Sequence, residues 1–227
     1  VRSSQSLLGI AVGSSLEVTA TDSVGAAPPV NVGSLVDLDL LGGLFGGGVP
    51  SYLKEGTDTA NTLNYSTETS AVRIYGYGGN DTLTGGSGSD IIRGGAGIDT
   101  INGGAGDDYL NGGAGNDFIT GGLGADTVGF DLLSNDATGG NGVDIWTDFS
   151  SLQGDKIDIS QLFEGQAVNA LNLETYVNLD YDEGTSTVVL SIDRDGGGNS
   201  YTELLKLTNQ TSEITLDDLL QNKNILF

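Results

Sequence analysis

The chain lacks three residue types altogether: cysteine, histidine and methionine. Without cysteine it has no disulfide to staple the fold and no thiol chemistry, and without histidine it has neither the usual zinc ligands nor a histidine-based triad. Hydrolysis by paired carboxylates remains open on composition alone. The absence of methionine even at position 1 predicts a piece of a longer protein.

Positive charge is also scarce, with 8 Lys+Arg against 31 Asp+Glu and a formal net charge of -23. Such a chain is repelled by nucleic acid and by anionic membranes, so we expect neither as a partner. The apolar stretch 36–49 is too short to span a bilayer and carries Asp37 and Asp39. The first residues do not match the pattern of an N-terminal signal peptide, so we expect any export to use another route. The charge is typical of an acidic soluble protein. A more specific interpretation is a protein that binds hard cations such as calcium, which prefer oxygen ligands.

The glycines follow a nine-residue repeat, GGxGxDxUx, in which U is a large apolar residue. Six copies run without a break from GYGGNDTLT at Gly76 to GGLGADTVG at Gly121, and GGNGVDIWT follows from Gly139. The sixth position is always aspartate: Asp81, Asp90, Asp99, Asp108, Asp117, Asp126 and Asp144. The eighth position is Leu83, Ile92, Ile101, Leu110, Ile119, Val128 and Trp146.

The segment between the last two copies, 130–138, is itself nine residues long. It is either a degenerate repeat that keeps the frame or a loop of coincidental length. Upstream, residues 56–75 resemble degenerate repeats that lack the aspartate at the sixth position. We expect them to form a terminal cap of the repeat array.

Each repeat divides into a glycine-rich turn and a short strand whose eighth residue points inward. If two repeats make one winding, equivalent aspartates lie eighteen residues apart in sequence and about 4.8 Å apart in space. In the unbroken frame Asp81, Asp99 and Asp117 form one column, and Asp90, Asp108, Asp126 and Asp144 the other. Bare carboxylates at that spacing repel, so the pattern predicts Ca²⁺ between them. The alternative is a disordered Gly/Asp-rich linker, which would suit the segment without calcium.

The repeats resemble the β-roll of the RTX (repeats-in-toxin) family of type I-secreted bacterial proteins. The resemblance implies an all-β fold, a right-handed parallel β-roll with a C-terminal β-rich cap. It also implies about five calcium ions, between the pairs Asp81/Asp99, Asp90/Asp108, Asp99/Asp117, Asp108/Asp126 and Asp126/Asp144. Main-chain carbonyls at positions two and four of one turn, and one and three of the next, complete each site. Carried over to this chain, these are Tyr77, Gly79, Gly86, Gly88, Gly94, Gly95, Ala96, Gly97, Gly103, Gly104, Ala105, Gly106, Gly112, Ala114, Gly121, Gly122, Leu123, Gly124, Gly139 and Asn141.

Glycine thins out after residue 147. Alternating apolar residues predict strands at 156–160, 176–181, 187–193 and 202–208, and Thr215 with Asp218 predicts a capped helix over 215–222. We expect residues 148–227 to cap the open end of the roll. They resemble the C-terminal target region of RTX proteins, which implies a type I secretion signal and the type I machinery as partner. Asp193 and Asp195 are candidates for a further calcium or for an ordinary hairpin turn.

The N-terminal part, 1–55, is expected to be the end of an upstream domain plus a linker. Residues 15–25, SLEVTATDSVG, resemble the last strand of an immunoglobulin-like extender domain of bacterial adhesins. The resemblance implies that residues 56–147 and 148–227 form a monomeric, non-catalytic module of an adhesin on a Gram-negative cell surface. The tail of a secreted protease, lipase or toxin is the alternative, and glycan binding through outward calcium is a third possibility.

Overall fold

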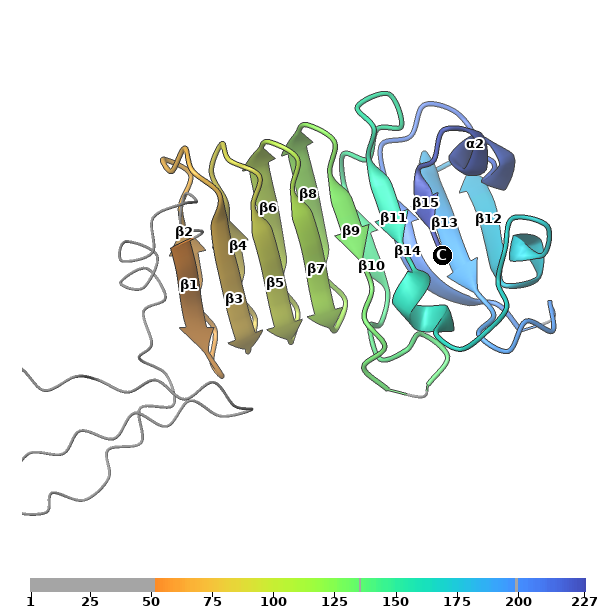
Figure 1. Cartoon of the computed structure of the whole chain (residues 1–227), viewed down its shortest axis with the longest axis horizontal. Coiled ribbons are helices and arrows are strands. Elements are labelled where there is room, and N and C mark those ends of the chain that lie inside the picture. The colour runs from red at the N-terminus through yellow and green to blue at the C-terminus, as the bar shows by residue number, and fades with distance from the viewer. Residues whose placement is uncertain (1–51, 135, 199) are drawn as a thin grey trace, which may run out of the picture. The chain divides into compact units, whose positions relative to one another are not determined.

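The computed structural model describes residues 52–134, 136–198 and 200–227, so the predictions for the extender strand and linker lie outside the described residues. Two sheets face each other along the length of this part (Figure 1). The first contains, in spatial order, β1 (Tyr52–Thr57), β3 (Val72–Gly78), β5 (Ile91–Ala96), β7 (Tyr109–Ala114), β9 (Thr127–Gly129), β11 (Lys156–Asp158) and β15 (Ile225–Leu226). The second contains β2 (Thr62–Asn64), β4 (Thr82–Thr84), β6 (Thr100–Ala105), β8 (Phe118–Leu123), β10 (Asp144–Trp146), β14 (Thr202–Leu207), β13 (Thr187–Ile192) and β12 (Val177–Asp182).

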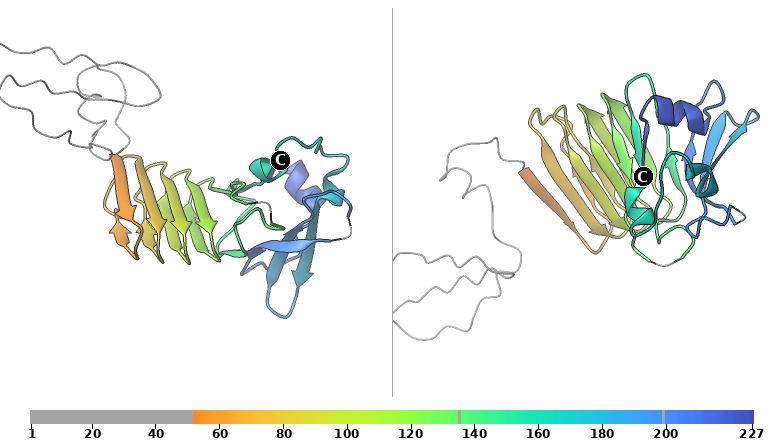
Figure 2. Two further views of the ribbon diagram at one scale, coloured as in Figure 1. Left: turned by 90° about the horizontal axis from the view of Figure 1, so that it is seen from below. Right: turned by 45° about the vertical axis from the view of Figure 1, so that its right-hand side comes forward.

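Successive repeats alternate between the two sheets, and neighbouring strands of the roll pair in parallel eighteen residues apart, as Leu83 does with Ile101. The two views in Figure 2 show this regular stack of short strands. The predicted all-β parallel β-roll is therefore confirmed. The roll was expected to begin at residue 56. Its first strand, β1, begins four residues earlier and pairs with β3 from Tyr52 onward.

Within the repeats, the apolar core consists of the residues at the eighth position, and it continues into the C-terminal segment with residues such as Val188, Leu190 and Leu205. In the first sheet Ile92, Leu110 and Val128 stack in register, and each is fully buried. The second sheet supplies Leu83, Ile101, Ile119 and Trp146 in the same way. Both stacks are continuous, so each turn of the roll buries its apolar residue against the apolar residues of the neighbouring turns.

Residues 130–134 and 136–138 belong to neither sheet, which favours the loop over the degenerate repeat. Strand β10 consequently pairs with β8, with Ile145 opposite Phe118. The predicted placement of Asp144 in the same column as Asp126 is wrong. The nine residues between the last two repeats add no strand to either sheet, so they do not count as a half-turn of the roll. Asp144 instead follows Asp117.

The segment after β11 continues both sheets beyond the roll. Strands β12 and β13 form an antiparallel hairpin, β14 pairs in parallel with β10, and β15 pairs in parallel with β11. Two 3₁₀ turns, Ser160–Phe163 and Leu173–Thr175, lie between β11 and β12 in the sequence, and the helix α2 (Leu216–Gln221) lies between β14 and β15. The predicted strands and the Thr215–Asp218 capping box are confirmed. No helix within the described part of the chain is long and apolar enough to cross a membrane.

Candidate metal centre

The repeat aspartates lie at the turns because the preceding glycines make a bend that other residues resist. At Gly97, for example, φ is +136°, and an added Cβ would overlap the carbonyl oxygen of Gly79 in the turn below. The glycine at the first repeat position lies against the Oδ2 of the aspartate in its own repeat, as Gly94 does against Asp99. The turn thus brings the carboxylate close to main-chain carbonyls.

The aspartates form two ladders of side chain to main chain hydrogen bonds. In each step the backbone N–H of one aspartate donates to Oδ1 of the aspartate in the next turn, at 2.7 Å for Asp81 to Asp99 and 2.8 Å for Asp99 to Asp117. The first ladder is Asp81, Asp99, Asp117 and Asp144, and the second is Asp90, Asp108, Asp126 and Asp155. All eight residues are buried.

The second carboxylate oxygen of the ladder is left without a partner at four places. Oδ2 of Asp81, Asp99, Asp108 and Asp117 is buried and makes no hydrogen bond to the protein. The ladder aspartates also take no part in the ion pairs Arg93–Asp131 and Lys206–Glu203. An isolated buried carboxylate is costly, because nothing replaces the lost hydration. These oxygens therefore fit a bound cation.

Burial raises the pKa of seven ladder carboxyl groups: those of Asp81, Asp99, Asp108, Asp117, Asp126, Asp144 and Asp155. The pKa of Asp108 and that of Asp144 rise to about 8, chiefly through desolvation and also through the neighbouring aspartates. Desolvation likewise raises the pKa of Asp117 and that of Asp126 to about 6. Without a cation, the charged forms of Asp108 and Asp144, one in each ladder, are thus disfavoured at neutral pH.

The carbonyl oxygens implied by the RTX resemblance lie in the same turns as the ladders. Carbonyls at the second and fourth positions point at the glycine eighteen residues later: Tyr77 at Gly95, Gly79 at Gly97, Gly86 at Gly104, Gly88 at Gly106, Gly95 at Gly113, Gly104 at Gly122 and Gly106 at Gly124. First-position carbonyls of Gly94, Gly103, Gly112 and Gly121 lie against the glycine of the turn before. Third-position carbonyls of Ala114 and Leu123 accept hydrogen bonds from Gly97 and Gly106, while Ala96 and Ala105 pair with their strand neighbours.

Two expected ligands are placed differently. The carbonyl of Gly139 accepts from the N–H groups of Leu133 and Ser134 at 2.7 and 2.8 Å, so it belongs to the 130–138 loop and not to an Asp126 site. The carbonyl of Asn141 accepts from Gly115, which places it beside the Asp117 turn. Both differences follow from the changed position of Asp144.

Two aspartates were missed by the repeat search. Asp155 stands next to Asp126, with Oδ1 accepting from Asp126 N–H at 3.0 Å and Oδ2 from Ser150 N–H at 2.8 Å. Asp148 accepts from the N–H groups of Gly121 and Gly122. The signal for Asp155 was available, because Asp155 and the buried Ile157 keep the Asp-x-apolar spacing of the repeat.

The loop between β13 and β14 contains the other predicted calcium ligands, Asp193 and Asp195. Oδ1 of Asp193 accepts from Asp195 N–H, and Oδ1 of Asp195 accepts from Gly197 N–H. Among the residues that the structure describes, no three acidic side chains converge on one point. A calcium here stays a prediction, and any metal site in the roll has to combine two carboxylates with carbonyl oxygens.

A family model described as the RTX calcium-binding nonapeptide repeat (4 copies) matches residues 68–92 and 93–128. The chain is similar to the R3 subunit of AlgE6, a mannuronan C5-epimerase of Azotobacter vinelandii, at 27% identity over 80% of this chain and 86% of that one, with a TM-score of 0.46. The R2 subunit of the same enzyme is 23% identical over 78% of this chain and 92% of that one, with a TM-score of 0.44. No curated protein matches the chain. The chain therefore carries RTX calcium-binding repeats.

Proposed function

We propose that this part of the chain is a non-catalytic module that folds when Ca²⁺ binds between successive turns of the roll. The observation that carries the proposal is the set of buried Oδ2 atoms without a partner on Asp81, Asp99, Asp108 and Asp117. Calcium prefers carboxylate and carbonyl oxygens at about 2.3–2.6 Å and tolerates irregular geometry. Both kinds of oxygen surround these turns, whereas thiol and imidazole ligands are missing from the sequence.

Five pairs of neighbouring aspartates are proposed to hold one calcium each: Asp81/Asp99, Asp99/Asp117, Asp117/Asp144, Asp90/Asp108 and Asp108/Asp126. The pair Asp117/Asp144 replaces the expected Asp126/Asp144. Each of these five pairs contains at least one aspartate whose Oδ2 is buried without a partner. The sixth pair, Asp126/Asp155, is left out because neither of its members has such an oxygen, and both oxygens of Asp155 accept hydrogen bonds from main-chain N–H groups.

The biological consequence we propose is a chain that stays open during export and folds outside the cell. Dissociation constants of extracellular calcium modules are about 10⁻⁴–10⁻³ M, far above cytosolic calcium. Inside the cell the aspartates would remain bare and resist burial. Outside, each site at a hundredfold its dissociation constant contributes about 2.7 kcal/mol. RTX calcium-binding repeats typically occur in secreted proteins, which supports this proposal.

For the parent protein we propose a large cell-surface adhesin that is exported by a type I system through a signal in residues 148–227. The support is the resemblance of residues 15–25 to an extender strand and of the C-terminal segment to an RTX target region. An enzyme tail is the alternative. The sequence upstream of Val1 distinguishes them, since extender domains favour the adhesin and a catalytic motif the enzyme.

The calcium assignment is tested by counting bound ions. Equilibrium dialysis against ⁴⁵Ca²⁺ on the whole chain should give about five ions. Asp99 belongs to two proposed pairs and Asp81 to one, so Asp99→Asn should lose two ions and Asp81→Asn one. The exposed Asp182, whose carboxylate binds its own turn, provides the matched control, Asp182→Asn. Equal counts for all four proteins would refute the assignment.

A further inference from the structure

A groove crosses the outer face of the first sheet, away from the stacked core. It encloses about 390 Å³. The backbone of Gly94–Ala96 and of Gly113 and Ala114 forms its floor, Tyr75 and Tyr77 line one side, and Asp131 and Leu133 of the 130–138 loop line the other. We call it the tyrosine groove. Its volume lies within the range typical of small-ligand sites.

Tyr77 occupies a backbone conformation that tyrosine normally avoids. Its φ is +73°, and it stands at the second repeat position, where the five following repeats all have glycine. A residue kept in a strained conformation that glycine would relieve points to a role for its side chain. Tyr77 is 48% exposed, and its hydroxyl donates a hydrogen bond to Glu55, which holds the ring in place.

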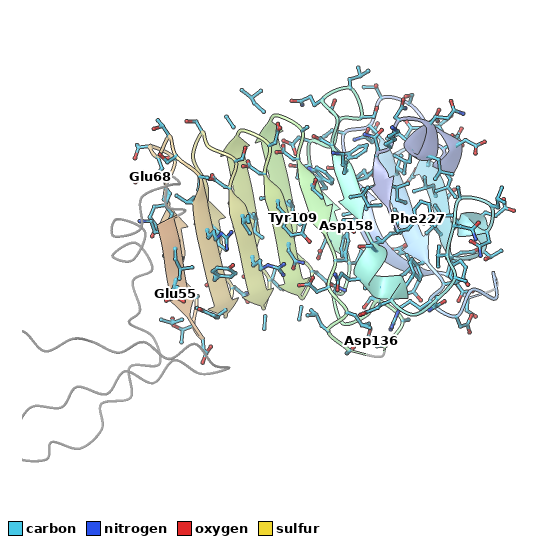
Figure 3. All side chains as sticks on the ribbon, in the orientation of Figure 1. Glu55, Glu68, Tyr109, Asp136, Asp158 and Phe227 are labelled. Atoms are coloured by element: carbon cyan, nitrogen blue, oxygen red, sulfur yellow. The ribbon has the colours of Figure 1, made fainter. Side chains whose placement is uncertain are left out.

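The two tyrosines present their rings side by side. The centroids of Tyr75 and Tyr77 are 6.4 Å apart, and the ring planes differ by 27°. Glu55 on β1 and Tyr109 on β7 mark the same face of the sheet in Figure 3. Two nearly parallel aromatic rings beside a flat glycine floor form an apolar platform for a ring-shaped ligand.

Polar groups are placed at the other end of the groove. Asn111 also lines it, is 2% exposed, and its Nδ2 has no hydrogen-bond partner. The Tyr109 phenol lies nearby without forming a well-aligned bond to that amide nitrogen. Arg93 forms an ion pair with Asp131 across the groove. A buried amide donor that lacks an acceptor is costly unless a ligand supplies one.

These features point to one class of ligand. We propose that the tyrosine groove binds a neutral saccharide, with a pyranose ring against Tyr75 and Tyr77 and its hydroxyl groups bonded to Asn111 and to the Arg93–Asp131 pair. A pyranose combines an apolar C–H face with a polar hydroxyl edge, and the groove offers both surfaces. Because Arg93 is already neutralised by Asp131 and the chain carries a net charge of -23, a uronate polymer is disfavoured.

The proposal is tested by isothermal titration calorimetry of the whole chain in calcium with malto-, cello-, manno- and xylohexaose, and with hexagalacturonate as the anionic comparison. At least one neutral hexasaccharide should bind. Tyr77→Gly removes the ring and restores the repeat consensus, so it should weaken that binding about tenfold while the melting temperature stays equal or rises. Asn111→Leu should weaken it as well.

The control is Ile98→Ala, which truncates an apolar side chain whose exposed fraction, 49%, is close to that of Tyr77, in a repeat turn outside the groove lining, and should leave binding unchanged. The proposal is overturned if no neutral hexasaccharide binds, if only the uronate binds, or if Tyr77→Gly binds as well as the unaltered chain. Because all titrations are made in calcium on chains with a measured melting transition, failure here is distinguishable from failure of the calcium assignment.

Discussion

The backbone N–H of Asp99 donates a 2.8 Å hydrogen bond to Oδ1 of Asp117, while Oδ2 of Asp117 is buried without a partner. One oxygen of the carboxylate therefore stabilises the stacking of turns, and the other is available to a cation. Asp81, Asp99 and Asp108 have the same two roles, and substitutions can separate them.

Replacing Asp108 with asparagine separates the two roles most clearly. Asparagine keeps an Oδ1 acceptor for Asp90 N–H but removes the charge that is costly in the metal-free roll. We expect Asp108→Asn to raise the free energy of unfolding in metal-free buffer and to lower it in millimolar calcium, by about 1–3 kcal/mol in each direction. Urea melts under both conditions measure this. The same sign under both conditions would contradict the account.

Stability of the metal-free roll should fall as pH rises. Burial raises the pKa of Asp108 and Asp144 to about 8, against about 3.9 in an unfolded chain, so the folded roll binds protons more tightly. The stabilisation is complete below about pH 4 and is lost as pH approaches 8. In calcium the trend should reverse, because protons compete with the metal. Urea melts at pH 5, 6 and 7 without metal check the first trend, and calcium titrations at pH 5, 6, 7 and 8 check the second.

The position of Asp144 can be tested by its energetic coupling to other aspartates. Asp117 N–H donates to Asp144 Oδ1 at 2.9 Å, whereas Asp126 contacts Asp155. Double-mutant cycles in calcium with Asp→Asn substitutions should give a coupling of about 0.5–3 kcal/mol for Asp117 with Asp144. Asp126 with Asp144 should be additive. The opposite pattern would restore the unbroken repeat frame.

The stacked core makes a prediction independent of metal. Ile101 is buried between Leu83 and Ile119, so Ile101→Ala should lower the free energy of unfolding in calcium by about 2–5 kcal/mol. Thr100, one residue earlier, is exposed, and Thr100→Ala should cost well under 1 kcal/mol. Similar losses for both substitutions would mean that residues at the eighth position do not form the core.

Much of this architecture follows from the repeat, because residue spacing alone decides which side chains share a column. Asp81, Asp99 and Asp117 were predicted to stack, and so were Leu83, Ile101 and Ile119, since parallel pairing at eighteen residues leaves few other arrangements. Asp144 was misplaced because a loop and a half-turn of nine residues have the same length. Asp155 was missed because two extra residues after Thr147 hide its spacing. The tyrosine groove depends on the 130–138 loop lying over the sheet, which no local pattern specifies.

The central claim is that calcium drives folding of the roll, and far-UV circular dichroism of the whole chain during a calcium titration tests it most directly. We expect little β signal in metal-free buffer at pH 8 and a cooperative gain near ~1 mM Ca²⁺. Magnesium at the same concentration should have no such effect, because Mg²⁺ demands octahedral geometry and gives up its water reluctantly. A chain that shows the full β signal before calcium is added would contradict the claim, since the buried carboxylates would then be tolerated without a cation.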